Sequence, residues 1–416
     1  MKYFMIFLFT CVWGFTRAQV NFVRNPDLEQ YNKCPDDWNL IFEANYWSSI
    51  IDSAYKFGGE YYNSCSNIYS DVALHVPSNV GFYQYPHSDS GMVGLVLYNN
   101  KSSSPPSPLP FDYRDYMQGR LYEPLTNGKT YCVSFWVNMT EESAYGHNKI
   151  GAYLDNGAIN KLPLPSGSEV TSVIPQVYTN DKIIDTANWV KIEGSFTANG
   201  TETFISIGNF FPNSAVDTVT TDYWIGSYQY SYYLVDDISV IPIDLNADAG
   251  KDNWVEIGKQ IQIGRVGDTT AKGLDCKWYK KGVLIDSGAI ITVNANTMKN
   301  AIDTYVVVQT ICGLVKTDTV TVKTAGVGIP LQGGLRDGFA IYPNPSDGNI
   351  TIIKSGNESV NLKGTVYDML GRIVFQESIH FLANQVQVKI GIPQGNYILE
   401  LKDESGNSYR QRILIQ

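Results

Sequence analysis

The chain has 416 residues, 41 acidic and 31 basic, and a formal net charge of −10 at pH 7. An acidic surface repels phosphate backbones and anionic lipid headgroups, so this balance argues against nucleic acid as a partner. The length exceeds that of one ordinary hydrophobic core, so we expect several domains.

Residues 1–18 predict a signal peptide. Lys2 precedes the apolar stretch Tyr3–Phe15, and a small-residue cleavage pattern follows at residues 16–18. The apolar stretch is shorter than the roughly 20 residues that a membrane-spanning helix needs. We therefore expect an exported, soluble mature chain that begins at Gln19.

Residues 19–243 predict the largest domain, built from short β-strands. Tyr and Gly are plentiful, only 17% of the chain is charged, and apolar runs are short and alternating, as in stacked β-sheets. The turn signal Asn127-Gly128 precedes an alternating strand at Tyr131–Val137. The polar segment Asn99–Pro110 predicts an exposed loop, and Tyr232–Val240 predicts the closing strand.

Residues 244–325 predict an immunoglobulin-like sandwich. Cys276 and Trp278 lie two residues apart on one predicted strand and so share a face. Cys312 lies in a predicted hairpin, and a cysteine on a partner strand can reach Cys276 in such a fold.

The leader carries one cysteine, Cys11, so five remain in an oxidising compartment where disulfides persist. We expect two bridges, Cys34 to Cys65 and Cys276 to Cys312, with Cys132 as a buried thiol. The alternative for either pair is two unbridged core thiols.

Residues 326–338 predict a linker, because repeated glycines and a proline prevent a regular element. Residues 339–416 predict a compact domain of strands and turns. Two prolines lie at a strand edge before an Asp-Gly turn at residues 347–348, and Gly371 suits the positive-φ position of a hairpin loop.

This last block resembles the type A C-terminal sorting domain of type IX secretion substrates. The residues that carry the resemblance are Pro343, Asn344, Pro345, Gly348, Gly371, Arg372, Gly395 and Tyr397. The resemblance implies a small β-sandwich that the outer-membrane machinery recognises, then usually removes and replaces by a link to lipopolysaccharide. It implies an extracellular or outer-surface location on a Gram-negative bacterium. The alternative is an ordinary terminal sandwich, because turn residues recur in unrelated folds.

The first block resembles jelly-roll modules of carbohydrate-binding type. Its opening Asn25–Glu29 is similar to their Asn-x-x-Phe-Glu, with Leu28 in place of the aromatic residue, and Val235–Ile238 is similar to their last strand. The resemblance implies that the first and last strands are neighbours. It also implies a structural calcium ion held by Glu29 and either Asp236 or Asp237; the alternative is that these are ordinary surface and strand-end acids.

Aromatic residues near predicted turns are candidates for stacking on sugar rings. They are Trp38, Trp47, Tyr83, Tyr85, Tyr113 and Tyr116. Trp136 and Trp189 lie inside strand-like runs, where aromatic side chains stabilise sheets by cross-strand packing. Core packing is the alternative for each candidate.

The sequence predicts no catalytic residues and no organic cofactor. It has no Gly-x-Ser-x-Gly elbow, and its four histidines, expected on the surface or in loops, form no His-Glu-x-x-His pair. Three adjacent acid pairs, at residues 36–37, 141–142 and 236–237, are formal candidates for glycoside hydrolysis. The leading hypothesis is an all-β, multidomain, non-catalytic glycan-binding or adhesive surface protein. The alternatives are a secreted glycan-active hydrolase and a purely structural envelope protein.

Overall fold

The computed structural model describes residues 20–50, 58–67, 74–79, 81–99, 113–161, 170–221, 230–298, 301–325, 339–354, 360–382, 385–403 and 408–416. The predicted signal peptide and linker lie outside these residues. The described chain is all-β, with four short 3₁₀ helices: η1 (Ile41–Glu43), η3 (Ala158–Lys161), η4 (Asn213–Ala215) and η5 (Thr269–Ala271). No helix in the described chain has the length and apolar character needed to cross a membrane.

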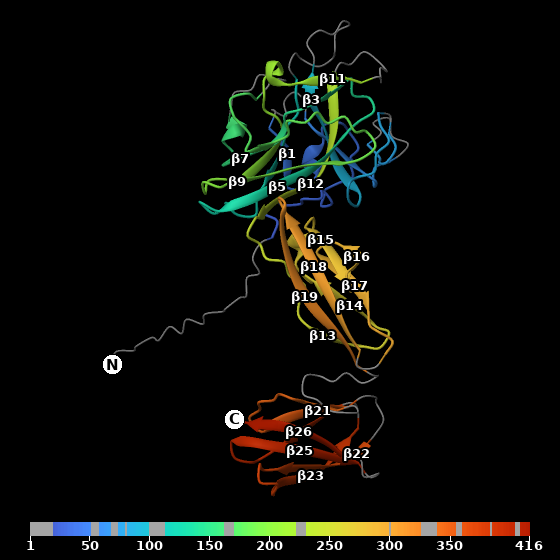
Figure 1. Cartoon of the computed structure of the whole chain (residues 1–416), viewed down its shortest axis with the longest axis vertical. Coiled ribbons are helices and arrows are strands. Elements are labelled where there is room, and N and C mark those ends of the chain that lie inside the picture. Colours follow the sequence, from blue (N-terminus) through green and yellow to red (C-terminus); the bar gives the residue numbers. More distant parts are fainter. Residues whose placement is uncertain are drawn as a thin grey trace, which may run out of the picture.

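The N-terminal domain, blue to green in Figure 1, is a sandwich of two five-stranded antiparallel sheets with strand orders β1-β4-β10-β7-β8 and β2-β3-β12-β5-β9. A two-stranded sheet, β11-β6, lies beside them. The strands are β1 (Trp47–Ser49), β2 (Glu60–Asn63), β3 (Gly91–Asn99), β4 (Met117–Arg120), β5 (Thr130–Met139), β6 (Tyr145–His147), β7 (Ile150–Asp155), β8 (Val177–Tyr178), β9 (Val190–Thr197), β10 (Phe204–Asn209), β11 (Thr218–Thr220) and β12 (Tyr230–Pro242).

Strand β5 shows how the sequence builds this core. Successive side chains of a strand point to opposite faces, so alternate residues share one face. Tyr131, Val133 and Phe135 belong to the domain core and are wholly buried. Cys132 and Trp136 therefore lie on the opposite face of the sheet.

The first described segment runs beside the last strand of this domain. The amide of Phe22 donates to the carbonyl of Val240 (2.9 Å), and the amide of Ile238 donates to the carbonyl of Pro26 (2.8 Å). The register of β12 against β5 shifts between Asp236 and Ser239. The two ends of the domain thus meet at the Asp236-Asp237 pair.

The middle domain, yellow to orange in Figure 1, packs a five-stranded sheet, β13-β19-β18-β15-β16, against the pair β14-β17. Trp278 is wholly buried at its centre and donates its indole N–H to the carbonyl of Gly288 (2.9 Å). The strands are β13 (Asn253–Glu256), β14 (Gln260–Gly264), β15 (Asp275–Lys280), β16 (Val283–Ser287), β17 (Ile290–Asn294), β18 (Ile302–Ile311) and β19 (Leu314–Ala325).

Contacts near residue 270 join the first two domains. The amide of Asn21 donates to the carbonyl of Thr270 (3.0 Å), and the Lys272 ammonium pairs with the carboxylates of Asp27 and Asp89. Val20 from the N-terminal domain belongs to the core cluster of the middle domain.

The C-terminal domain, red in Figure 1, pairs a three-stranded sheet, β20-β21-β24, with a four-stranded sheet, β23-β22-β25-β26, around its own core. The strands are β20 (Phe339–Tyr342), β21 (Asn349–Lys354), β22 (Val360–Tyr367), β23 (Ile373–Phe381), β24 (Gln385–Lys389), β25 (Gly395–Asp403) and β26 (Ser408–Ile415).

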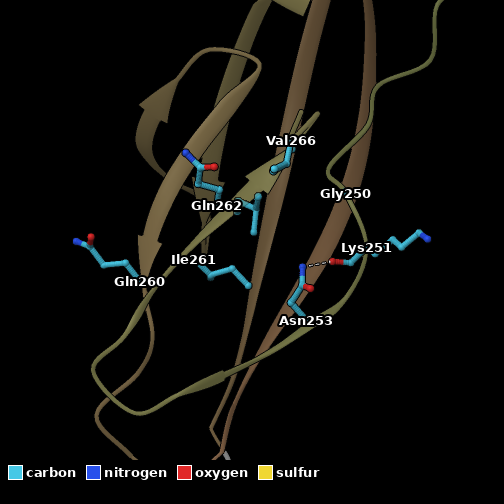
Figure 2. Close-up of a pocket in the computed structure, with 9 residues that line it drawn as sticks. Gly250, Lys251, Asn253, Gln260, Ile261, Gln262 and Val266 are labelled. Carbon is cyan, nitrogen blue, oxygen red and sulfur yellow. Dashed lines mark hydrogen bonds between the residues drawn. The ribbon is translucent and has the colours of Figure 1, made fainter. Parts of the chain in front are cut away.

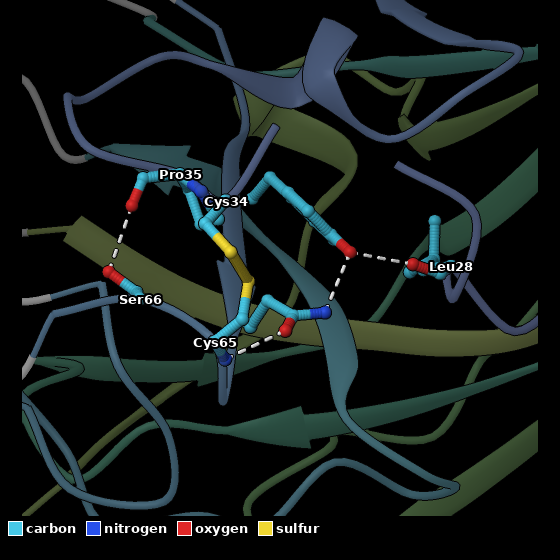
Figure 3. Close-up of a disulfide and its surroundings, with 7 residues drawn as sticks. Leu28, Cys34, Pro35, Cys65 and Ser66 are labelled. Atoms are coloured by element: carbon cyan, nitrogen blue, oxygen red, sulfur yellow. Dashed lines mark hydrogen bonds between the residues drawn. A yellow bond between two sulfur atoms is a disulfide. The ribbon is translucent and has the colours of Figure 1, made fainter. Parts of the chain in front are cut away.

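The first disulfide pairs Cys34 with Cys65, the pairing that the sequence suggested, with Cα atoms 5.7 Å apart. Hydrogen bonds hold the chain on both sides of it (Figure 3). The Ser66 hydroxyl donates to the carbonyl of Pro35 (2.8 Å), and the Cys65 amide donates to the Asn63 side chain (2.9 Å).

The predicted bridge between Cys276 and Cys312 is wrong. Cys312 bonds to Cys132 across the two domains, and Cys276 is the buried thiol. In the register of β15 and β18, Cys276 lies opposite Gln309, whereas Cys312 lies beyond the end of β18. Cys132 faces the middle domain because it lies on the opposite face of β5 from the core residues.

Candidate functional site

The structure separates the six predicted sugar-stacking residues into two groups. Tyr83, Tyr85 and Trp38 are 57%, 60% and 42% exposed. Trp47, Tyr113 and Tyr116 are buried, so the prediction that they offer ring faces to a glycan is wrong.

Hydrogen bonds explain why these three side chains are inside. The Trp47 indole donates to the carbonyl of Asn25 (2.9 Å), and the Tyr116 hydroxyl donates to the carbonyl of Asn209 (2.8 Å). The Tyr113 hydroxyl donates to the carboxylate of Asp115. Each polar group has a partner, so burial of the ring adds apolar contact without leaving a donor unsatisfied.

Five residues form what we call the aromatic cluster: Tyr83, Tyr85, His87, Trp136 and Trp189. The rings of Tyr83 and Tyr85 meet at right angles with centroids 5.9 Å apart. His87 stacks on Trp136 at 4.0 Å, and Trp189 lies edge-on to His87 at 5.8 Å. The indole of Trp189 donates to the carbonyl of Tyr85 (3.0 Å) and so connects the two parts of the cluster.

Sequence reasoning placed Trp136 and Trp189 in packed strands and missed their role here. The alternation of β5 contained the signal for Trp136, because Phe135 and Val137 on either side of it face the core. His87 carried no such signal, because its position depends on where the loop that precedes β3 lies in the folded chain. Trp189, directly before β9, contacts the same loop through its bond to Tyr85.

The aromatic cluster borders the acidic residues at the ends of the domain. His87 Nδ1 lies 2.5 Å from Asp237 Oδ2, and the Ser88 hydroxyl donates to Asp237 Oδ1 (2.9 Å). The amide of Ser88 donates to Asp236 Oδ2 (3.1 Å). Burial raises the pKa of Asp236 well above its usual value, and repulsion from Asp237 adds to the effect.

Glu29 lies at the same junction. Its Oε1 accepts hydrogen bonds from the amides of Ser90 (2.8 Å) and Gly91 (2.6 Å). Burial raises its pKa, although these two amides oppose the effect.

These carboxylates are hard oxygen ligands of the kind that calcium prefers. Within the described residues, however, they do not converge as a set of three side-chain ligands. The sole such set that the described residues form places ligand atoms of Cys132, Cys312 and Glu193 within 4.8 Å of one another, and its two sulfurs form the disulfide. A calcium ion held by Glu29 and Asp236 or Asp237 would therefore also need backbone carbonyls or water.

The sequence analysis did not identify a second acid pair, the half-buried Glu60 and the buried Asp115. The Glu60 carboxylate accepts from the Tyr232 hydroxyl, which lies 3.0 Å from the hydroxyl of Tyr62. Burial raises the pKa of Asp115 to about 6, and burial together with repulsion from Asp115 raises that of Glu60. Asp115 is 1% exposed, so it is not presented to an external polysaccharide.

Among the four histidines, the expectation of a surface or loop position is wrong for His147. This residue is wholly buried at the end of β6, and burial lowers its pKa to about 3. Its Nδ1 lies 2.6 Å from the carbonyl of Asn148.

The residues of the sorting motif tie the start of the C-terminal domain to its last strand. The Asn344 side chain donates to the carbonyl of Arg412 (2.8 Å) and accepts from the amide of Leu414 (2.8 Å). Gly348 has a φ of 96°, and a Cβ there would lie 2.7 Å from the carbonyl oxygen of Ile390. Only glycine fits this turn without strain.

The remaining motif residues hold the hairpins of this domain. Gly371 has a φ of 80° in the loop between β22 and β23, and Arg372 Nε donates to Asp368 Oδ2 (2.7 Å) across that loop. The Tyr397 hydroxyl donates to the carbonyl of Pro393 (2.8 Å), and its ring lies 3.3 Å from where a Cβ on Gly395 would be.

Solved structures similar to parts of the chain include binding and adhesin domains. The CBM22-1 xylan-binding domain of Paenibacillus barcinonensis Xyn10C is 12% identical over 39% of this chain and 78% of its own, with a TM-score of 0.23. The K1 cleaved adhesin domain of Lys-gingipain from Porphyromonas gingivalis is 12% identical over 48% and 91%, with a TM-score of 0.27. A protein with an immunoglobulin-like β-sandwich fold from Bacteroides vulgatus is 13% identical over 21% and 100%, with a TM-score of 0.18. Likenesses this weak carry no argument about function.

No curated protein matches the chain. Residues 340–416 match the family described as the secretion system C-terminal sorting domain. The chain therefore carries a type IX sorting domain and is exported to the extracellular space or the outer cell surface.

Proposed function

We propose that the N-terminal domain binds a polysaccharide without cleaving it, and that the aromatic cluster is the binding surface. The observation that carries the proposal is the exposed, mutually perpendicular pair Tyr83 and Tyr85. An exposed ring face can stack on the apolar face of a sugar, and two rings at right angles offer surfaces for adjacent units of a chain.

The loop that carries these tyrosines is held before any ligand arrives. The amide of Gln84 donates to the carbonyl of Pro77 (2.9 Å), and the Asn79 side chain accepts from the amide of Gly81 (2.8 Å). The hydrogen bond from the Trp189 indole to the carbonyl of Tyr85 holds the end of this loop that is nearer to β3. A loop ordered in advance loses less conformational entropy on binding.

Alanine substitutions on the full chain test the proposal. A glycan array first identifies a ligand, and retention on that glycan is then compared for the wild type, Tyr83→Ala and Tyr85→Ala. Loss of one stacking ring should weaken binding by about 3- to 10-fold. Tyr46→Ala is the matched control, because Tyr46 is 52% exposed but lies outside the aromatic cluster.

Two results would overturn this function. If no glycan on the array is retained, the purely structural envelope role takes its place. If a bound glycan releases reducing sugar, the protein is a glycan-active hydrolase instead.

The proposal includes a structural calcium ion held by Glu29 and Asp236 or Asp237. Its support is the chemistry of the donors, because carboxylate oxygens are the ligands that calcium prefers. Burial raises the pKa values of Glu29 and Asp236, and a bound cation would offset that cost of burying their charge. Chelation should then lower the melting temperature of the wild type but not of Glu29→Gln. An unchanged melting temperature on chelation would mean that Glu29 and Asp236 or Asp237 hold no metal ion.

After export, we propose that the chain is attached to lipopolysaccharide or released. This step rests on the type IX sorting domain at residues 340–416. Mass spectrometry of surface-bound protein from the native host would detect the attached lipid on the new C-terminus.

A further inference from the structure

Strand β14 of the middle domain pairs with another described strand along one edge only. The amide of Ala295 donates to the carbonyl of Lys259 (2.8 Å), and the amide of Arg265 donates to the carbonyl of Ala289 (3.1 Å). In an antiparallel ladder the residues that bond across one edge alternate along the strand. Residues 259, 261, 263 and 265 therefore point their backbone groups toward β17, while Gln260, Gln262 and Gly264 point theirs outward.

Within the described part of the chain, one backbone hydrogen bond joins the outward edge to another segment. The amide of Gly264 donates to the carbonyl of Ala249 (2.9 Å), as it would if residues 244–250 continued as a third strand. At Gly250 the chain turns away, with a φ of 84°, and crosses to β13, which pairs in parallel with β19 in the other sheet. A Cβ on Gly250 would lie 2.9 Å from the carbonyl oxygen of Gly264, so this close crossing requires glycine.

The crossing leaves a groove of about 620 Å³ between the outward edge of β14 and the segment Gly250–Asn253 (Figure 2). Ile261, Ile263 and Val266 supply its apolar lining. The side chain of Asn253 donates to the carbonyl of Lys251 (2.6 Å) and closes the opposite wall. Lys251 is the one charged residue among the described residues that line the groove.

We propose that this groove binds an extended polypeptide segment of a partner protein, which adds to β14 as a strand. The backbone N–H and C=O groups of Gln260 and Gln262 have the spacing that another backbone satisfies, and open strand edges pair with added strands in this way. Apolar side chains on one face of the segment would contact Ile261 and Val266. The Lys251 side chain points away from β14 (Figure 2), so its charge does not select the segment.

The walls of the groove favour a single strand over a second copy of this chain. In every copy of the chain, the segment Gly250–Asn253 lies opposite the outward edge of β14. If two copies paired through their β14 edges, these two segments would collide. A polysaccharide would lack the alternating donors and acceptors that match Gln260 and Gln262, and the lining offers no aromatic ring for it to stack on.

Hydrogen exchange of the full chain from Gln19 to Gln416 tests the proposal. The probe is a synthetic peptide, Glu-Ala-Ile-Ile-Thr-Val-Asn-Ala-Glu with blocked ends, whose centre copies residues 289–295, the segment that pairs with the other edge of β14. The peptide should slow exchange of the Gln260 and Gln262 amides. The same peptide N-methylated at its three central residues should have no effect, because it cannot donate to the edge.

Two variants separate backbone from side-chain recognition. Gln262→Pro removes the outward N–H, which β17 does not use, and should weaken peptide binding at least about 10-fold. Gln262→Ala keeps that N–H and should change peptide binding less than about 3-fold. Equal binding of the N-methylated peptide, or protection elsewhere on the chain, would overturn the proposal. So would concentration-dependent protection of these amides without peptide, which would identify a second copy as the occupant.

Discussion

His147 is a titratable residue held entirely inside the N-terminal domain. Its ring packs edge-on against Tyr233 with centroids 5.0 Å apart, and its backbone amide donates to the Tyr233 hydroxyl (3.1 Å). Its Nε2 has no hydrogen-bond partner among the described residues. Burial disfavours a charge on this ring and the nearby Arg114 charge adds to the effect, which explains the pKa of about 3 although the Asn148 carbonyl opposes it.

His147 should make the domain sensitive to acid. An unfolded histidine has a pKa of about 6.5, so between pH 6.5 and pH 3 the unfolded chain binds more protons than the folded chain. Stability is then lost as pH falls through this window, by on the order of 5 kcal/mol for this one group. Denaturant unfolding of the wild type and His147→Gln at several pH values measures the effect. Because glutamine does not titrate, the variant should lose less stability on acidification, and parallel pH profiles would contradict the assignment.

At the scale of elements, the segment before Gly348 is fastened to β26 by a side chain. Asn344 both donates to and accepts from the backbone of β26, and the amide of Ser346 donates to the carbonyl of Leu414 (2.9 Å). The Pro-Asn-Pro part of the sorting motif thus joins the N-terminal end of the domain to its C-terminal strand. These residues of the motif therefore stabilise the fold of the domain, in addition to any contact with the secretion machinery.

Asn344→Ala should destabilise the sorting domain by about 1–2 kcal/mol, because it removes two hydrogen bonds. Asn349→Ala is the control, since its side chain bonds to Asp347 within the same turn. Thermal unfolding of both variants and the amount of protein exported measure the outcome. Equal loss of stability in the two variants would show that Asn344 has no special role.

At the scale of the whole molecule, the disulfide between Cys132 and Cys312 crosslinks the N-terminal domain to the middle domain. It spans 180 residues, against 31 for the Cys34 to Cys65 bridge. On the chain-entropy model, the longer loop contributes roughly 5 kcal/mol and the shorter roughly 4 kcal/mol. Thr270 and Lys272 reinforce the same junction.

Peptide mapping without reduction should recover Cys132 linked to Cys312, with Cys276 as the free thiol. Burial raises the pKa of Cys276 to about 12, so it should react with alkylating agents only after unfolding. Cys312→Ser should lower the melting temperature of the domain pair, whereas Cys276→Ala should leave the bridge in place. A peptide that links Cys276 to Cys312 would refute the pairing.

We expect the C-terminal domain to be a sorting signal that is cleaved off after export. Export of a chain that lacks residues 339–416 should fail, because the sorting domain is gone. In the native host, mature protein should end between Gly326 and Asp337, where the glycine-rich sequence predicts a stretch that a protease can enter. Mass spectrometry of surface-exposed protein decides this, and an intact Gln416 would argue against processing.

The sequence by itself determined the all-β class, the sorting domain and the faces of long strands. These properties depend on local patterns. Alternation in β5 puts Phe135 inside and Trp136 outside, and the turn at Gly348 accepts only glycine because of its φ. The sorting motif could be recognised because its residues resemble those of a known family of sorting domains.

Only the tertiary structure decided which cysteines pair, which aromatics are exposed and which acids are buried together. Cys276 and Cys312 had a plausible spacing, but the register of β15 and β18 keeps them apart. Tyr83 and Tyr113 both lie near turns, yet Tyr113 is buried against Asp115 while Tyr83 faces solvent. These outcomes depend on how whole sheets pack, which joins Cys132 to Cys312 across 180 residues, and the neighbours of a side chain in sequence do not set that packing.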